Sequence, residues 1–263
     1  METIIRISAA LGIFCIMICW EYVSPRRMQC VSRKKRWPVN LGLAAVNIGI
    51  MRLSLGGIAY LSAVTAANQG YGLLNYLAAP DPLAIIATLL FLDFAIYCQH
   101  IVSHKWPLLW RLHQVHHTDL EFDATTAVRF HPLEIVISML YKVLCIGLIG
   151  ANPWAVIAFE IILNGAATFN HSNINIPKAV DKKLRWLLVT PDMHRIHHSI
   201  VPAETDSNYG FSISCWDRLC KTYIAEPEQP QMTMAIGLKS FRLQQELGIM
   251  QLLLLPFKAL RKR

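Results

Sequence analysis

Histidines are the residues in this sequence best suited to chemistry, and all ten lie between residues 100 and 198. Eight of them form one H-x-x-x-H pair and two copies of the pattern H-x-x-H-H: His100 and His104; His113, His116 and His117; His194, His197 and His198. Residues three and four apart on a helix lie on one side. Each motif is therefore predicted to project two or three imidazoles into one place, as a metal site requires.

Helix-start signals support this reading of the two triple motifs. Pro107 precedes the first triple, and Thr190 and Pro191 precede the second as a predicted N-cap and first helical residue.

A ninth histidine, His171, ends an apolar run and shares a polar stripe with Glu160 and Asn164. Polar groups at membrane depth are costly unless they face an interior site. We therefore predict that His171 binds metal. For Glu160 and Asn164, a buried hydrogen-bond network without catalysis is the alternative.

The number of histidines predicts two metal ions. Structural zinc takes four protein ligands and catalytic zinc usually three, whereas this sequence offers at least eight. Imidazole suits iron, zinc, copper and nickel, so ligand type alone does not name the metal. The H-E-x-x-H pattern of zinc proteases and the Glu-x-x-His set of soluble di-iron bundles are both absent from the sequence.

Composition places these histidines in a membrane protein. Hydrophobic residues make up 54% of the 263 residues and charged residues 16%, and the mean hydropathy is +0.37. A soluble domain is usually about a quarter charged. The net charge of +8 does not indicate nucleic-acid binding, because the basic clusters flank apolar segments, where membrane topology already predicts them.

Five apolar runs predict an all-α, multi-pass transmembrane helical bundle, at about 4–22, 39–66, 83–104, 133–150 and 153–170. Asn152 and Pro153 predict a tight helical hairpin between the last two runs, which either cross the membrane or re-enter it. The loop 24–38 carries six Lys or Arg residues and is predicted to be cytoplasmic. The histidines then form a cytoplasmic helical cap.

We expect three regions along the chain. Residues 1–82 supply N-terminal membrane anchor helices, 83–225 the metal-binding domain, and 226–263 a basic C-terminal tail.

At five blocks the sequence resembles the fatty acid hydroxylase superfamily, which includes sterol desaturases, C-4 methyl sterol oxidases and alkylglycerol monooxygenases. The resemblance covers about residues 85–225. Besides H-x-x-x-H at 100–104, it rests on these blocks: LWRLHQVHHTD at 109–119, TTAVRFHPLE at 125–134, NHSNINIP at 170–177, TPDMHRIHHS at 190–199 and ETDSNYGFSISCWDRL at 204–219. One departure is Cys220-Lys221, where we expect a Phe-Gly pair.

The resemblance implies a non-haem di-iron site that uses O2 as co-substrate to attack a C–H bond of a lipid or sterol. Its ligands map to His100, His104, His113, His116, His117, His171, His194, His197 and His198. His131 is either a further ligand, a group that orients one, or a mere helix start before Pro132. Candidate orienting groups are Glu160, Asn164 and Asp192, with Asp119, Asp123, Glu134, Asn170, Asp206 and Asn208.

The implied reaction is hydroxylation or desaturation, and the sequence does not decide between them. No dinucleotide fingerprint follows a strand, so a separate ferredoxin- or cytochrome-type donor with its reductase is expected. A bacterial cell membrane is favoured over the endoplasmic reticulum. A non-redox zinc-dependent membrane hydrolase or a metal-handling protein is the alternative function.

Overall fold

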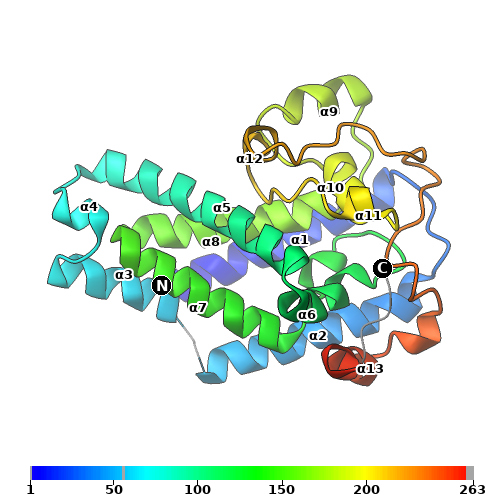
Figure 1. Cartoon of the computed structure of the whole chain (residues 1–263), viewed down its shortest axis with the longest axis horizontal. Helices are drawn as coiled ribbons and strands as arrows, with labels where there is room; N and C mark the ends of the chain where they lie inside the picture. Colours follow the sequence, from blue (N-terminus) through cyan, green and yellow to red (C-terminus); the bar gives the residue numbers. More distant parts are fainter. Residues whose placement is uncertain (1, 55–56, 259–263) are drawn as a thin grey trace.

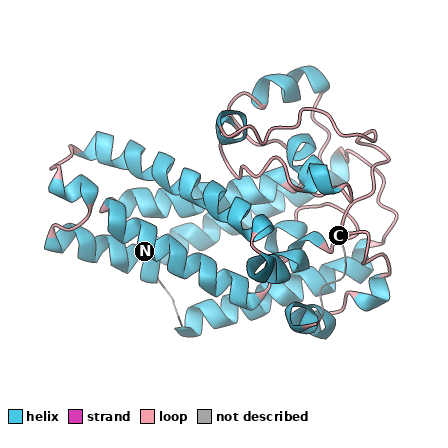
Figure 2. Cartoon of the chain, viewed as in Figure 1, coloured by secondary structure: helices cyan, strands magenta, loops and turns pink. Residues whose placement is uncertain are grey.

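The computed structural model describes residues 2–54 and 57–258, and over these ranges the chain is helical, with isolated β-bridges and no strand (Figure 2). The all-α prediction is confirmed. The longer helices are α1 (Glu2–Val23), α2 (Arg33–Ser54), α3 (Ile58–Gln69), α5 (Asp81–Lys105), α6 (Pro107–His117), α7 (Pro132–Ile149) and α8 (Pro153–Asn170). Shorter helices are α4 (Leu73–Tyr76), η1 (Thr126–Val128), α9 (Lys178–Leu184), α10 (Pro191–His197), α11 (Pro202–Thr205), α12 (Cys215–Leu219), η2 (Gln244–Glu246), α13 (Ile249–Leu254) and η3 (Leu255–Phe257).

Four segments are long and apolar enough to cross a membrane: Glu2–Val23, Arg33–Tyr76, Asp81–Lys105 and Pro132–Ile149. The predicted second run, 39–66, is divided between α2 and α3, and part of it, 55–56, lies outside the described residues. Gly57 starts α3 with a φ of +74°, a conformation that favours glycine.

The predicted hairpin between α7 and α8 is confirmed. Asn152 caps α8, its side-chain oxygen accepting hydrogen bonds from the backbone N–H groups of Trp154 and Ala155 at 2.9 and 3.3 Å. Gly150 ends α7 with a φ of +68°, and a Cβ there would lie 2.8 Å from the carbonyl oxygen of Tyr71. The hairpin turn thus requires glycine both for its conformation and for its close packing.

The long helices α1, α3, α5, α7 and α8 pack together as a bundle, and the short helices α9 to α12 gather toward one end of it (Figure 1). The core of the bundle is apolar and includes Leu92, Ile146 and Phe159. We call residues 106–131 and 171–225 the head. The segment after residue 225 also packs inward, because Phe241 and Leu252 are buried against Leu43 of α2.

A charged network joins α2 to the head. Arg36 donates hydrogen bonds to Asp119 at 2.6 and 2.7 Å and to Asp123 at 2.7 Å, with all three side chains buried. Asn40, one turn later on α2, donates to Asp119 at 3.0 Å. Burial alone would raise the pKa of Asp119, but the Arg36 guanidinium outweighs it and holds that pKa well below its usual range. The network fixes the loop that directly follows His116 and His117.

Candidate metal centre

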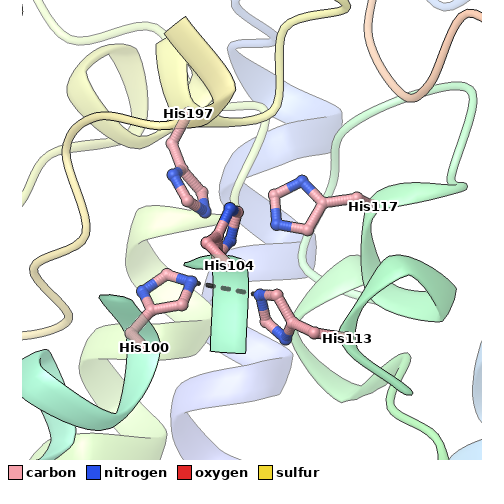
Figure 3. Close-up of side chains that lie close together, drawn as sticks. All are labelled: His100, His104, His113, His117 and His197. Carbon is pink, nitrogen blue, oxygen red and sulfur yellow. Dashed lines mark hydrogen bonds between the residues drawn. The ribbon is translucent and has the colours of Figure 1, made fainter. Parts of the chain in front are cut away.

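Nine buried histidines meet where the bundle joins the head, and they form two adjacent groups. The first group is His100, His104, His113, His117 and His197, whose rings point toward a common centre in Figure 3. The second group is His116, His171, His194 and His198. Within each group the possible ligand atoms all lie within 4.8 Å of one another.

Helical spacing decides which group each imidazole joins. His113 and His117 are four residues apart on α6 and both enter the first group, whereas His116 turns to the second. In the other triple the i and i+4 residues, His194 and His198, enter the second group. Each H-x-x-H-H motif therefore contributes histidines to both groups. The sequence pattern had predicted only that the imidazoles of one motif would lie in one place.

The distances between ring nitrogens fit shared metal ligands. The Nε2 atoms of His100 and His113 lie 3.1 Å apart, as Figure 3 marks, and those of His194 and His171 lie 3.2 Å apart. Two imidazoles that bind one ion at right angles, each at about 2.1 Å, hold their nitrogens about 3 Å apart. The donor set therefore fits a bound metal.

Ring nitrogens without a hydrogen-bond partner also indicate a metal site. Both ring nitrogens of His117 and of His198 are buried without a hydrogen-bond partner in the described chain. Leaving buried polar atoms unpaired is costly. A metal ion would satisfy one nitrogen on each ring.

The protonation states also suit metal binding. Burial lowers the pKa of His171 to about 4, and burial, followed by the neighbouring histidines, lowers the pKa of His116, His117, His194 and His198 well below the usual value. At neutral pH these imidazoles are uncharged, the form that donates a lone pair to a metal.

Several outer ring nitrogens have defined partners. Nδ1 of His100, His197 and His171 lies 2.7 Å from the backbone carbonyl oxygens of Tyr209, Ser207 and Ala167 respectively. Such contacts fix the tautomer and direct Nε2 inward.

His113 has a charged partner instead. Its Nδ1 lies 2.6 Å from Oε1 of Glu134, in the first turn of α7. Of the orienting groups that the sequence suggested, Glu134 contacts a clustered histidine directly, and Asp206 lies 3.4 Å from Nδ1 of His104.

His131 lies in neither group. Its Nδ1 accepts a hydrogen bond from the backbone N–H of Leu133 at 3.1 Å, so it caps α7. Its Nε2 lies 3.2 Å from the carbonyl oxygen of Leu253. These contacts fit the alternative in which His131 only starts helix α7.

Three of the suggested orienting groups, Glu160, Asn164 and Asp192, form their ion pairs and hydrogen bonds with residues other than the clustered histidines. Glu160 pairs with Arg6 and Lys142, and Asn164 donates to the Glu160 carbonyl at 2.8 Å. Asp192 pairs with Arg195 and, at 2.8 Å, with Arg26 of the loop after α1. This second pair ties the start of α10 to that loop.

A cavity of about 500 Å³ adjoins the first group of histidines. It lies among α2, α5, α7 and α8, and both His100 and His113 line it. Most of its other lining residues are apolar, such as Ile96, Leu163 and Phe211. Its size is in the range that buries a drug-sized ligand.

Sequence reasoning missed the aromatic rings that pack on the imidazoles. Phe130 stacks on His116 with 4.5 Å between centroids and 5° between planes, and Phe122 stacks on His171. Phe130 stands inside the TTAVRFHPLE block, but a phenylalanine in a head loop carries no signal of its own.

Fold and site define a class of protein: an all-helical membrane protein with a buried, all-histidine site of metal-binding spacing. The family model described as fatty acid hydroxylase matches residues 85–222, and the chain belongs to that family.

Curated relatives agree with this assignment. The chain is 30% identical over 201 residues to an alkylglycerol monooxygenase of Xenopus tropicalis, covering 73% of this chain and 42% of the relative. It is 26% identical over 212 residues to the ornithine lipid hydroxylase OlsE of Rhizobium tropici, covering 76% and 63%. A cholesterol 25-hydroxylase of Rattus norvegicus is 21% identical over 150 residues, covering 56% and 49%. The chain thus spans less than two thirds of each of these relatives, and no solved structure matches it.

Proposed function

We propose that this protein is a membrane-bound, O2-dependent di-iron oxidase that hydroxylates or desaturates an aliphatic C–H bond of a lipid or sterol. The observation that carries the proposal is the division of nine buried histidines into two adjoining groups, one beside a cavity whose lining is mostly apolar. The relatives named alkylglycerol monooxygenase and ornithine lipid hydroxylase support a lipid substrate.

Each group of histidines would hold one iron. The proposed ligands are His100, His104, His113, His117 and His197 for the first iron, and His116, His171, His194 and His198 for the second. The groups adjoin closely, since the rings of His117 and His198 stack with centroids 4.4 Å apart. When bound, the iron pair supplies the capacity to activate O2 for attack on an unactivated C–H bond.

The chain itself contributes position and exclusion of water. An apolar substrate chain would lie against the cavity wall beside His100 and His113, and the burial of the nine histidines keeps bulk water from them. Glu134 accepts the outer N–H of His113 and orients that ring.

Electrons would come from a separate ferredoxin- or cytochrome-type donor with its reductase. Exposed Lys182 and Lys183 on α9 suit an acidic partner, because complementary charge speeds encounter.

We further propose that the histidines face the cytoplasm of a bacterial cell. The basic loop after α1 contacts the head through Arg26 and Asp192, so loop and histidines lie on one side. Excess Lys and Arg marks the cytoplasmic side. A hydroxylase of Rhizobium tropici among the relatives supports a bacterial membrane.

Metal analysis with Mössbauer spectroscopy on protein expressed with iron tests the proposal. We expect about two coupled, reducible irons per chain, and 18O from O2 in a lipid product or a new double bond in the same lipid. Tightly held zinc with no iron-dependent turnover after iron reconstitution would replace the proposal by a zinc-dependent hydrolase or a metal-handling protein.

A further inference from the structure

One loop of the head supplies the backbone carbonyls that contact two histidines of the first group. The loop 207–210 lies between α11 and α12, and we call it the carbonyl loop. The Ser207 carbonyl oxygen lies 2.7 Å from Nδ1 of His197, on α10. The Tyr209 carbonyl oxygen lies 2.7 Å from Nδ1 of His100, on α5. The carbonyl loop therefore connects two proposed ligands of one group that come from different helices (Figure 3).

The buried carboxylate of Asp217, on α12, holds the peptide that carries the Tyr209 carbonyl. A trans peptide is planar, and its C=O and N–H point in opposite directions. The N–H of Gly210 shares this peptide with the Tyr209 carbonyl and donates to Oδ2 of Asp217 at 2.9 Å. The N–H of Tyr209 donates to Oδ1 at 2.7 Å, so both carboxylate oxygens accept from the loop. A Cβ at Gly210 would lie 2.8 Å from Oδ2 of Asp217, so this close approach requires glycine.

Asn208 holds the peptide that carries the Ser207 carbonyl. Its backbone N–H shares that peptide and donates to the carbonyl oxygen of Thr222 at 2.9 Å. Its φ of +48° lies in the left-handed region, which asparagine adopts more readily than most residues. Its buried side-chain amide donates to the carbonyls of Met193 at 3.1 Å and Ile224 at 2.9 Å. Because Met193 lies on α10, these bonds fix the carbonyl loop to the helix of the second H-x-x-H-H motif.

The second group of histidines is oriented without this loop. Nδ1 of His171 contacts the carbonyl oxygen of Ala167, in the helix that His171 directly follows. The Nδ1 atoms of His116 and His194 have no hydrogen-bond partner among the described residues. A change in the carbonyl loop therefore acts on the rings of the first group.

We propose that Asp217 and Asn208 are positioning residues for the first iron: they hold the carbonyl loop so that His100 and His197 direct Nε2 toward the ion. This role rests on the proposed di-iron function. Loss of the partners that orient metal-binding histidines lowers metal affinity by about 10- to 100-fold. Disturbing the carbonyl loop should therefore weaken the first iron and leave the second as it is.

Chelator competition on the iron-loaded chain in detergent tests the proposal. Asp217→Asn leaves one acceptor oxygen for two N–H donors, because an NH2 group replaces the other oxygen. We expect this variant to release one iron per chain at about 10- to 100-fold lower chelator concentration and the other iron at the unmodified concentration. Asn208→Gly allows the left-handed conformation but loses the side-chain bonds, and it should give the same result.

Asp181→Asn is the matched control. Asp181 is a buried aspartate of the head that pairs with Arg185 on α9. Its substitution disturbs a buried carboxylate away from the carbonyl loop and should leave the release of both irons unchanged.

Two histidine variants identify which iron is weakened. His171→Ala keeps the first group complete, and adding Asp217→Asn to it should weaken the remaining iron. His100→Ala keeps the second group complete, and the same addition should change nothing. A merely structural role of Asp217 would weaken the iron in both backgrounds.

Equal weakening of both irons, with a lower unfolding temperature, would overturn the proposal, because the carbonyl loop would then only stabilise the head. Release of both irons at the unmodified concentration from Asp217→Asn and Asn208→Gly would overturn it as well. If Asp217→Asn does not fold, Asn208→Gly decides in the same assay. The iron count needs no turnover, so a chain that binds two irons without oxidising a lipid would fail the proposed function and keep the positioning result.

Discussion

The Nε2 atoms of His116 and His171 lie 3.1 Å apart, although 55 residues separate the two histidines in the sequence. One stands on α6 and the other directly follows α8. His117, the next residue after His116, belongs to the other group. The end of α6 therefore serves both groups, and α8 delivers His171 to one of them.

The division into two groups predicts that a single substitution removes one iron. His171→Ala should lower the iron content from about two to about one per chain, because His171 belongs to the second group alone. Iron and protein quantification on the same sample measures the ratio.

His131→Ala is the matched control for that loss. It should keep two irons while losing about 1 kcal/mol of stability, since His131 caps α7. Loss of iron in His131→Ala, or two full irons in His171→Ala, would refute the assignment.

A second prediction concerns the contact between His113 and Glu134. Glu134→Gln keeps an oxygen near His113 Nδ1 but loses the negative charge, and Glu134→Ala removes the acceptor. Loss of such partners lowers metal affinity or activity by about 10- to 100-fold, so Glu134→Ala should retain iron more weakly than Glu134→Gln.

Chelator competition against both Glu134 variants measures that order. The exposed Glu226 provides the control Glu226→Gln, which should retain iron like the unmodified chain. Equal iron retention in all three variants would show that Glu134 does not support the site.

Local signals made much of this fold predictable. Thr190 caps α10, accepting a hydrogen bond from the backbone N–H of Met193 at 3.4 Å, as its place before Pro191 indicates. Caps, prolines and helical periodicity act over a few residues and can be read directly.

Long-range features were not predictable in the same way. The pairing of Arg6 with Glu160 joins residues 154 positions apart, and no local pattern selects that partner. The carbonyl partners of the histidines, such as that of Tyr209, are backbone atoms that every residue has. The polar face of α2 is visible in the sequence, because Arg36, Asn40 and Asn47 recur at helical spacing. The apolar run 39–66 overlaps these positions and hides that face.

The network around Arg36 predicts a large loss of stability in Arg36→Met. The substitution leaves Asp119 and Asp123 buried without their cation, which costs about 3–5 kcal/mol when one partner of a buried pair is removed. Thermal unfolding in one detergent should show the loss, together with weaker iron retention. Lys35→Met, at the exposed neighbouring residue, should change neither, and an unfolding temperature of Arg36→Met equal to that of Lys35→Met would contradict the prediction.

The cavity predicts a steric block of turnover without loss of metal. Ala44 of α2 lines the cavity, whereas its neighbour Ala45 is exposed. Ala44→Phe places a ring where the substrate chain would lie, and steric exclusion of this kind costs about tenfold or more in rate.

Mass spectrometry of oxidised lipids in the membranes of expressing cells measures the turnover of each Ala variant. Iron analysis of the protein purified from the same membranes measures its iron content per chain. Ala45→Phe should match the unmodified chain in both. If Ala44→Phe oxidised lipids at the unmodified rate with both irons present, the substrate would have to reach the histidines by another route, and the cavity would lose its role.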